Sequence, residues 1–140
     1  MRVHVKKSIT SLLAKQMIDA AAQKAEEIGM SIAITIVDES GVLKAFSRMD
    51  TAPLVAVDAS RKKAITAVGF GFPTGDAWYN FIKEDPILHE GAHNLKDFIL
   101  LGGGAPIVVD DTIVGAIGIS GGHYKQDEIC LNAALDVLKS

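Results

Sequence analysis

Residues 106–120 read PIVVDDTIVGAIGIS, in which two runs rich in Val and Ile flank a pair of aspartates. β-branched residues fit the pleated surface of a strand, and adjacent aspartates favour a tight turn between two strands. We therefore predict an antiparallel hairpin that turns at Asp110 and Asp111. A hairpin pairs neighbouring strands without a helical crossover, so it indicates an antiparallel sheet.

A second hairpin is predicted earlier in the chain. Residues 31–37 read SIAITIV and residues 42–49 read VLKAFSRM, and the turn sequence DESG separates them. Two β-rich runs joined by such residues are typical of paired antiparallel strands. Residues 95–103, LKDFILLGG, precede the other hairpin and are a candidate for a fifth strand.

Helical patterns surround the two hairpins. Apolar residues recur every three to four positions between Ser8 and Ile28, which predicts a first helix, and Gly29 is a natural stop. A second helix is predicted to begin near Pro53, with Thr51 as a candidate cap.

The remaining helices lie in the second half of the chain. Residues 74–95 predict one or two short helices broken near Pro86, and residues 126–138 predict a final helix. The order is helix, hairpin, helices, hairpin, helix, without the strand-helix-strand alternation that builds a parallel sheet. We therefore expect one domain, residues 1–140, of the α+β class, with helices packed against an antiparallel sheet.

The composition narrows the classes of function. The net charge is −3, and Lys and Arg are scattered, so we expect no nucleic-acid partner. No apolar stretch reaches the roughly 18 to 20 residues that a membrane-spanning helix needs, and the N-terminus lacks the pattern of an export signal. We therefore expect a cytoplasmic protein with no membrane partner. The single cysteine, Cys130, is expected to be a buried apolar residue of the last helix.

Residues 89–93 read HEGAH and match the H-E-x-x-H pattern of two-histidine zinc proteases. In such a protease His89 and His93 bind zinc from one helical face, and Glu90 is the general base toward the metal-bound water. The local sequence disfavours this function, because Gly91 weakens the helix and no H-x-x-G-x-x-H continuation follows. The weaker hypothesis that His89 and His93 bind a metal or a haem iron stays open.

Glycine clusters lie on both sides of the second hairpin, at Gly102 to Gly104 and at Gly118 to Gly122. Glycines let backbone amides approach a ligand closely, and the second cluster leads into a helix whose N-terminal amides could hold an anion. We expect a positive φ at Gly121 or Gly122. Ligand binding and simple tight turns both stay open, whereas the spacing excludes a phosphate loop and a serine nucleophile elbow.

Charged residues lie near the first hairpin and on the second predicted helix. Arg48 and Asp50 close the hairpin, and the simplest interpretation is a local ion pair. For the triplet Arg61, Lys62 and Lys63 the simplest interpretation is a solvated helix face.

Several short motifs follow one another in order along the chain. They are Arg48-Met49-Asp50 with Ala52, Lys63-Ala64 with Thr66-Ala67, Phe70 and Thr74, Gly102-Gly103 with Pro106, GAIGISGG from Gly115 to Gly122, and Asp127-Glu128. With these motifs the sequence resembles the GlcG/HbpS-like family and the C-terminal domain of PduO-type proteins. The resemblance spans nearly the whole chain, and GAIGISGG with the upstream glycines is its most specific part.

The resemblance implies a profilin-like fold, in which helices sandwich a five-stranded antiparallel sheet in α/β/α layers. It also implies a homo-oligomer, from a dimer up to an octamer. Some members of the family bind or slowly degrade haem, some relate to corrinoid metabolism, and some occur beside genes for diol, glycerol or glycolate utilisation. Because the chain has no Cys-x-x-Cys-His motif, any haem would be held non-covalently.

We therefore expect an accessory protein that binds a small molecule, namely haem or a related tetrapyrrole or corrinoid cofactor. The expected cofactor-binding residues are Gly103, Gly104, Gly121, Gly122, Lys62, Lys63, Arg48 and His93. The glycines would offer amides, a lysine would bind a propionate, and His93 or else His89 would ligate iron. Two alternatives stay open: an enzyme that acts on a small oxygenated substrate, with Arg48 and Asp50 as polar catalytic groups, and a structural oligomer without a ligand.

Overall fold

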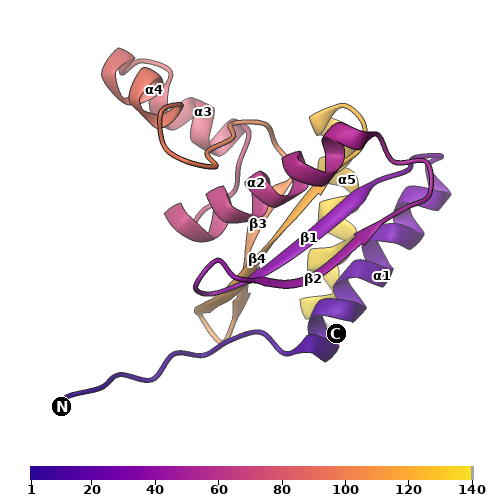
Figure 1. The fold of residues 1–140 in the computed structure, drawn as a ribbon, viewed down its shortest axis with the longest axis horizontal. Coiled ribbons are helices and arrows are strands. Elements are labelled where there is room, and N and C mark those ends of the chain that lie inside the picture. The colour runs from indigo at the N-terminus through magenta and orange to yellow at the C-terminus, as the bar shows by residue number, and fades with distance from the viewer. Residues whose placement is uncertain (140) are drawn as a thin grey trace.

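The structure is a computed structural model that describes residues 1–139. Four antiparallel strands form the centre of this part of the chain (Figure 1). In sheet order they are β2 (Leu43–Arg48), β1 (Ala33–Asp38), β4 (Thr112–Ser120) and β3 (Gly104–Val109). Both predicted hairpins are confirmed, since β1 pairs with β2 and β3 with β4. Asp110 and Asp111 have φ of 51° and 60°, and positive φ at both central residues is the geometry that suits a two-residue hairpin turn.

The predicted fifth strand at residues 95–103 is wrong. Within residues 1–139 the sheet has four strands, and this segment reaches β3 through a turn at Asp97, whose φ is 64°. Its carbonyl groups make isolated hydrogen bonds and no ladder: Leu100 accepts from Gly75, and Gly103 accepts from Ile119. The α+β class with an antiparallel sheet is therefore confirmed, while the profilin-like description stays a prediction.

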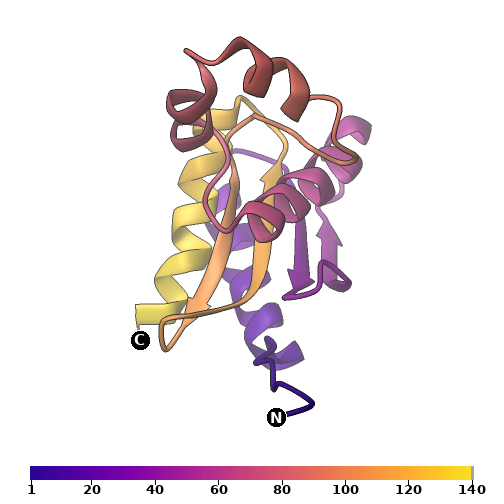
Figure 2. The same ribbon diagram turned by 90° about the vertical axis from the view of Figure 1, so that its left-hand side faces the viewer.

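Helices cover the sheet on both faces (Figures 1 and 2). Helices α1 (Ser11–Glu27) and α5 (Tyr124–Asp136) pack side by side on one face, and a 3-10 turn, Val137–Lys139, continues α5. Helix α2 (Leu54–Phe70) packs on the other face, over β1, β4 and β3. The edge strand β2 is thus left without a helix on the α2 side.

The larger hydrophobic core lies between the sheet and the α1–α5 layer. Strand alternation sends Ile34, Ile36, Ile117 and Ile119 to this face, where they join buried residues of α1 and α5. Cys130 belongs to this core, as predicted. Because these side chains are fully removed from water, this layer supplies most of the apolar burial that stabilises the fold.

The layer between α2 and the sheet is thinner and built from small residues. Ser60 and Ala64 of α2 lie directly over Gly118 of β4, where an added Cβ would come within 2.6 Å of the Ala64 nitrogen. The Ser60 hydroxyl is 2.8 Å from the Thr35 hydroxyl of β1. The absence of a side chain at Gly118 therefore allows the backbone of α2 to approach the backbone of β4.

A lobe of two short helices projects beyond the C-terminal end of α2 (Figure 1). It contains α3 (Asp76–Ile82) and α4 (Pro86–Ala92), so the predicted break near Pro86 is confirmed. Asp85 caps α4 by accepting the Leu88 amide at 3.0 Å. The predicted cap at Thr51 is wrong, because Pro53 occupies the N-cap of α2 without a side-chain bond.

Among residues 1–139, none of the helices combines the length and the apolar character needed to cross a membrane.

Candidate functional site

A buried ion pair lies where α2, β4 and α5 meet. The Lys63 ammonium is 3.0 Å from Asp127 Oδ2 and donates a second hydrogen bond of 2.8 Å to the Ile119 carbonyl. Both side chains are 1% exposed. The interpretation of residues 61–63 as a solvated helix face is therefore wrong for Lys63, which points inward from α2.

The glycines around Lys63 explain how a long side chain crosses the end of the sheet. A Cβ on Gly103 would come within 3.0 Å of Lys63 Nζ, and a Cβ on Gly104 or Gly118 would come within 3.0 Å of Lys63 Cβ. These three glycines come from both predicted clusters. They leave the space through which Lys63 reaches Asp127 on the α5 side.

Burial dominates the electrostatics of this pair. Desolvation lowers the pKa of Lys63, and the neighbouring Asp127 carboxylate opposes that shift. Asp127 also accepts the Gly122 amide through Oδ1 at 3.0 Å, so one carboxylate holds both the lysine and the start of α5. Such an arrangement fixes the relative positions of three elements.

The glycines do not have the predicted backbone conformation. Neither Gly121 nor Gly122 has a positive φ, so that prediction is wrong, whereas Gly103 has φ of 120°. Gly121 is required for another reason, because a Cβ there would come within 2.9 Å of Ile32 Cα. At this position glycine serves close packing of two backbones.

The amides that were expected to meet a ligand largely have partners within the chain. Gly104 donates to the Thr74 hydroxyl at 2.9 Å, and Gly122 donates to Asp127. His123 caps α5 by accepting the Lys125 amide at 3.1 Å, and the Gln126 side chain accepts the His123 amide. The start of α5 is therefore closed by its own side chains, which leaves little capacity for an anion there. Ligand binding by the glycines stays a prediction.

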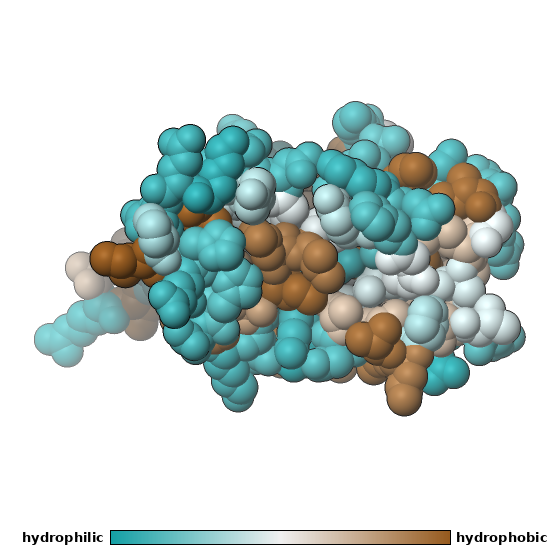
Figure 3. Space-filling model, turned by 90° about the horizontal axis from the view of Figure 1, so that it is seen from above, coloured by the Kyte–Doolittle hydropathy of each residue, from teal (hydrophilic) through white to brown (hydrophobic). Residues whose placement is uncertain are grey.

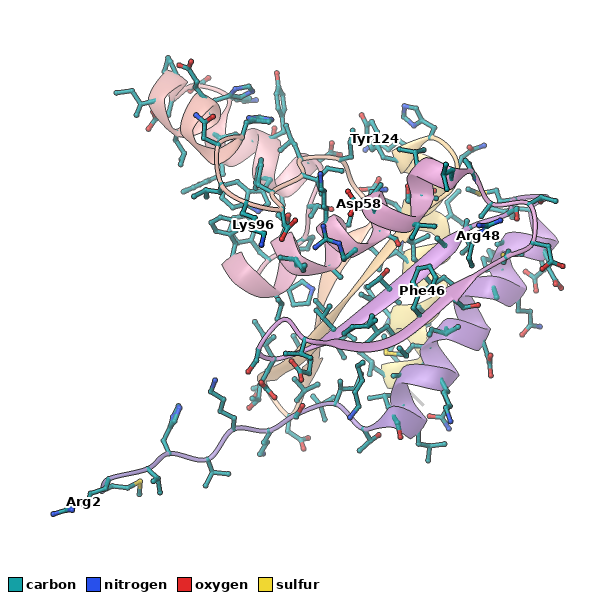
Figure 4. All side chains as sticks on the ribbon, in the orientation of Figure 1. Arg2, Phe46, Arg48, Asp58, Lys96 and Tyr124 are labelled. Carbon is teal, nitrogen blue, oxygen red and sulfur yellow. The ribbon has the colours of Figure 1, made fainter. Side chains whose placement is uncertain are left out.

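The other predicted residues lie elsewhere. Lys62 stays near the α2 surface, 3.3 Å from Asp58. Arg48 is exposed on β2 (Figure 4), and the expected ion pair with Asp50 is absent among residues 1–139. The structure thus brings Lys63 and the glycines together but places Lys62, Arg48 and the lobe histidines apart from them.

The two histidines of HEGAH lie on one side of α4. Their ring centroids are 5.1 Å apart, and His93 Nδ1 is 2.7 Å from the His89 carbonyl oxygen. A carbonyl only accepts, so Nδ1 carries the hydrogen, and Nε2 is the ring nitrogen through which His93 could bind a metal. The His93 ring also packs edge-on against Phe98, with centroids 5.3 Å apart.

A zinc protease site would need further ligands near these histidines. Within residues 1–139, no three or more side chains of His, Cys, Asp or Glu gather in a group that could hold a metal ion. The Glu90 carbonyl accepts the Asn94 side-chain amide at 3.3 Å, and the Glu90 residue itself is exposed. The described part of the chain therefore leaves His93 Nε2 without a hydrogen bond and assembles no catalytic metal centre around these histidines.

A small cavity opens beside the first glycine cluster. It has a volume of about 210 Å³ and is lined by Gly75, Asp76, Tyr79, Leu100, Leu101, Gly102 and Tyr124. Asp76 of this lining forms an ion pair with Lys125, whose ammonium is 2.6 Å from Asp76 Oδ2. Tyr124, labelled in Figure 4, comes from the first turn of α5. Sequence reasoning missed these rim residues, because no local pattern marks side chains that meet only through the fold.

The comparisons with known proteins agree with this fold. Residues 9–136 match the family model described as haem degrading protein HbpS-like. The chain belongs to the HbpS-like family. It is 31% identical over 129 residues to an uncharacterized 15.0 kDa protein in the dhaT-dhaS intergenic region of Citrobacter freundii, covering 92% of this chain and 91% of that protein.

Solved structures show the same architecture. The crystal structure of Klebsiella pneumoniae protein ORFY superposes with a TM-score of 0.90 at 28% identity, covering 100% of this chain and 97% of that one. The crystal structure of the PduOC:heme complex superposes with a TM-score of 0.77 at 26% identity, covering 91% and 93%. The resemblance to the GlcG/HbpS-like family is therefore confirmed.

Proposed function

We propose that this protein binds haem or a related tetrapyrrole non-covalently and that His93 is the iron ligand. The HbpS-like family and the haem complex of a structural relative support the class of ligand. The observation that carries the choice of residue is the 2.7 Å contact between His93 Nδ1 and the His89 carbonyl. When a histidine binds a metal through one ring nitrogen, a hydrogen bond from the other ring nitrogen fixes the tautomer and orientation of the imidazole.

The surroundings of His93 suit a flat, anionic cofactor. Phe98 gives an apolar edge next to the imidazole, and Leu95 is 52% exposed close by in the chain. The hydrogen bond with Arg61 is the main cause that lowers the pKa of Asp97. Lys96, labelled in Figure 4, and Lys62 of α2 lie near enough to add to this lowering of the pKa. When bound, haem iron would supply the redox and ligand-binding chemistry, and the two lysines would pair with propionates.

Haemin titration tests this proposal. We expect a saturable shift of the Soret band with wild type and a changed band position with weaker binding in His93→Ala. His89→Ala should keep the band position, because the His89 contact to His93 comes from its backbone carbonyl. His4 is an exposed histidine near the N-terminus, and His4→Ala is therefore the matched control. A His93→Ala variant with the wild-type spectrum and affinity would exclude His93 as the ligand.

A second candidate function rests on the 210 Å³ cavity, whose volume suits a small molecule but not a tetrapyrrole. In this alternative the protein acts on a small oxygenated substrate of diol, glycerol or glycolate utilisation. Tyr79, Tyr124 and Asp76 would offer polar groups to its hydroxyls. Binding of glycerol or glycolate that disappears in Gly102→Leu, together with no haemin binding, would favour this alternative.

We also propose that the protein forms a homo-oligomer with closed symmetry. Large apolar side chains are exposed on and beside the edge strand: Val42 is 61% exposed, Leu43 62% and Phe46 41%. At the start of α2, Leu54 is 82% and Val55 73% exposed. An exposed apolar area of this kind supports a protein contact.

A further inference from the structure

The two histidines of α4 present ring nitrogens that a ligand from solvent can reach. His93 is exposed and uses Nδ1 for its contact with the His89 carbonyl, so Nε2 is its available nitrogen. Neither ring nitrogen of His89 has a hydrogen bond among residues 1–139, and neither is buried. In this respect the pair differs from His123, whose Nδ1 already accepts the Lys125 amide.

The spacing of the two rings suits a shared metal ion. Residues four positions apart lie on the same side of a helix, and the ring centroids of His89 and His93 are 5.1 Å apart. A zinc–imidazole bond is about 2.0 to 2.1 Å long, so two rings that bind one ion at about 90° to 110° have centroids roughly 4.5 to 5.3 Å apart. The observed separation lies within this range, so one ion can bind both rings while the helix backbone stays in place.

The charges around the pair favour a cation. Residues 84–93 contain three acidic residues, Glu84, Asp85 and Glu90, and no Lys or Arg. All three are exposed, and Asp85 caps the helix that carries both histidines. Figure 3, which looks onto the molecule from above, shows hydrophilic side chains over much of this face, with apolar patches among them. A hydrated cation thus meets a negatively charged segment that also offers nitrogen ligands.

We propose that His89 and His93 together chelate a divalent transition metal ion that prefers imidazole ligands, such as Zn²⁺, Ni²⁺ or Cu²⁺. Water completes the coordination, because within residues 1–139 no group of three or more His, Cys, Asp or Glu side chains gathers around an ion. Mg²⁺ and Ca²⁺, which prefer oxygen ligands, are not expected to bind there. The site differs from the proposed haem site, since haem iron takes His93 alone and this chelate needs both rings.

Zinc titration of the metal-free protein tests the proposal. Calorimetry should show saturable binding of one Zn²⁺ per chain and no comparable binding of Mg²⁺. Losing one of two linked ligands removes the advantage of intramolecular binding, so His89→Ala and His93→Ala should each weaken zinc binding by roughly a hundredfold. His4→Ala is the matched control and should bind zinc like wild type. Wild-type zinc affinity in His89→Ala or in His93→Ala would overturn the proposal.

A variant with a displaced histidine separates chelation from the mere presence of imidazoles. Gly91 lies in α4 with no atom within 4 Å of an added Cβ, so a side chain there has room. The double variant His93→Ala with Gly91→His keeps the number of histidines but places the second ring two residues from His89, where the two side chains do not face each other. It should bind zinc as weakly as His93→Ala. Wild-type affinity in this double variant would contradict a chelate that depends on the spacing.

Proton NMR identifies the ligands directly, because the chain has four histidines and therefore four imidazole Hε1 signals. Zinc should shift the signals of His89 and His93 and leave those of His4 and His123 in place; the reverse pattern would refute the proposal. His89→Ala separates this site from the haem site, since it should lose zinc binding and keep the haemin Soret band. The zinc measurements need no haem, so a failure of haemin binding would refute the haem proposal alone.

Discussion

The Lys63 ammonium lies 3.0 Å from Asp127 Oδ2 at a point where both side chains are 1% exposed. The pair joins α2 on one face of the sheet to α5 on the other. The Lys63 side chain reaches Asp127 through the space that Gly103, Gly104 and Gly118 leave, near the start of β3 and the end of β4. The glycine motifs and the ion pair are therefore one structural unit.

Removing one partner of this pair should be strongly destabilising. In Lys63→Met the Asp127 carboxylate stays buried without its cation, and we expect the free energy of unfolding to fall by about 3 to 5 kcal/mol. Urea denaturation followed by circular dichroism measures the change. The double variant Lys63→Met with Asp127→Asn should lose less than the sum of the single variants, because neither charge remains buried. Additive losses would show that the two side chains do not interact as the structure indicates.

The close approach of α2 to β4 makes a second prediction. A Cβ on Gly118 would overlap the backbone at Ser60 and Ala64, so Gly118→Ala should destabilise the protein by about 1 to 3 kcal/mol through overpacking. Gly91→Ala is the control: Gly91 lies in α4 with no atom within 4 Å of an added Cβ. There alanine should stabilise by about 0.5 to 1 kcal/mol. Thermal melts compare the two, and a neutral Gly118→Ala would contradict the packing described.

Local sequence patterns are sufficient to predict most of the fold. The two hairpins and the break near Pro86 follow from turn residues and β-branched runs, which act over a few positions. Residues 95–103 were misread because their apolar residues suit a strand, yet they enter the lobe and the loop before β3. Phe98, for example, packs against Phe70 and Trp78. Such tertiary contacts override a propensity that short sequence windows detect.

The candidate site was predicted less well, for a related reason. Lys63 follows two solvated cations, and nothing in the triplet distinguishes it from Arg61 or Lys62. Its burial depends on Asp127, which lies 64 residues later. The motif Asp127-Glu128 follows the second glycine cluster, and an aspartate near a helix start is a natural acceptor of backbone amides. That signal could have identified Asp127 but not its pairing with Lys63.

The ion pair of Arg61 and Asp97 makes stability depend on acid pH. Arg61 lies 2.8 Å from Asp97, and its hydrogen bond holds the pKa of that carboxyl below its ordinary value. A lowered carboxyl pKa stabilises the folded state above the unfolded pKa, about 3.9, and the contribution is lost as pH falls through the folded value. Because Arg61 is 41% exposed, solvent screening limits the contribution to about 0.5 to 1 kcal/mol.

Asp97→Asn tests this dependence, since asparagine tolerates the positive φ at this position. We expect the variant to be less stable than wild type at pH 7, and the difference to shrink as pH falls through the lowered pKa of Asp97. Asp110→Asn, the same change at another aspartate with positive φ, should show no comparable difference. Urea titrations at several pH values measure the profiles, and a pH-independent gap for Asp97→Asn would exclude the ion pair as its cause.

The exposed side of β2 makes the last prediction, which concerns assembly. Strand pairing places Phe46 of β2 opposite Thr35, on the α2 side of the sheet. On that side α2 covers β1, β4 and β3 but not β2. Figure 4 shows Phe46 and Arg48 along β2. If a second copy covers Phe46, Phe46→Glu would bury a charge at the contact, so sedimentation at micromolar concentration should change from an oligomer to a 14.8 kDa monomer. Leu12→Glu, at a 66% exposed position of α1 on the opposite layer, is the matched control and should keep the wild-type assembly. A wild-type protein that sediments only as a monomer would refute the proposed oligomer, and an intact Phe46→Glu oligomer would show that the contact lies on another surface.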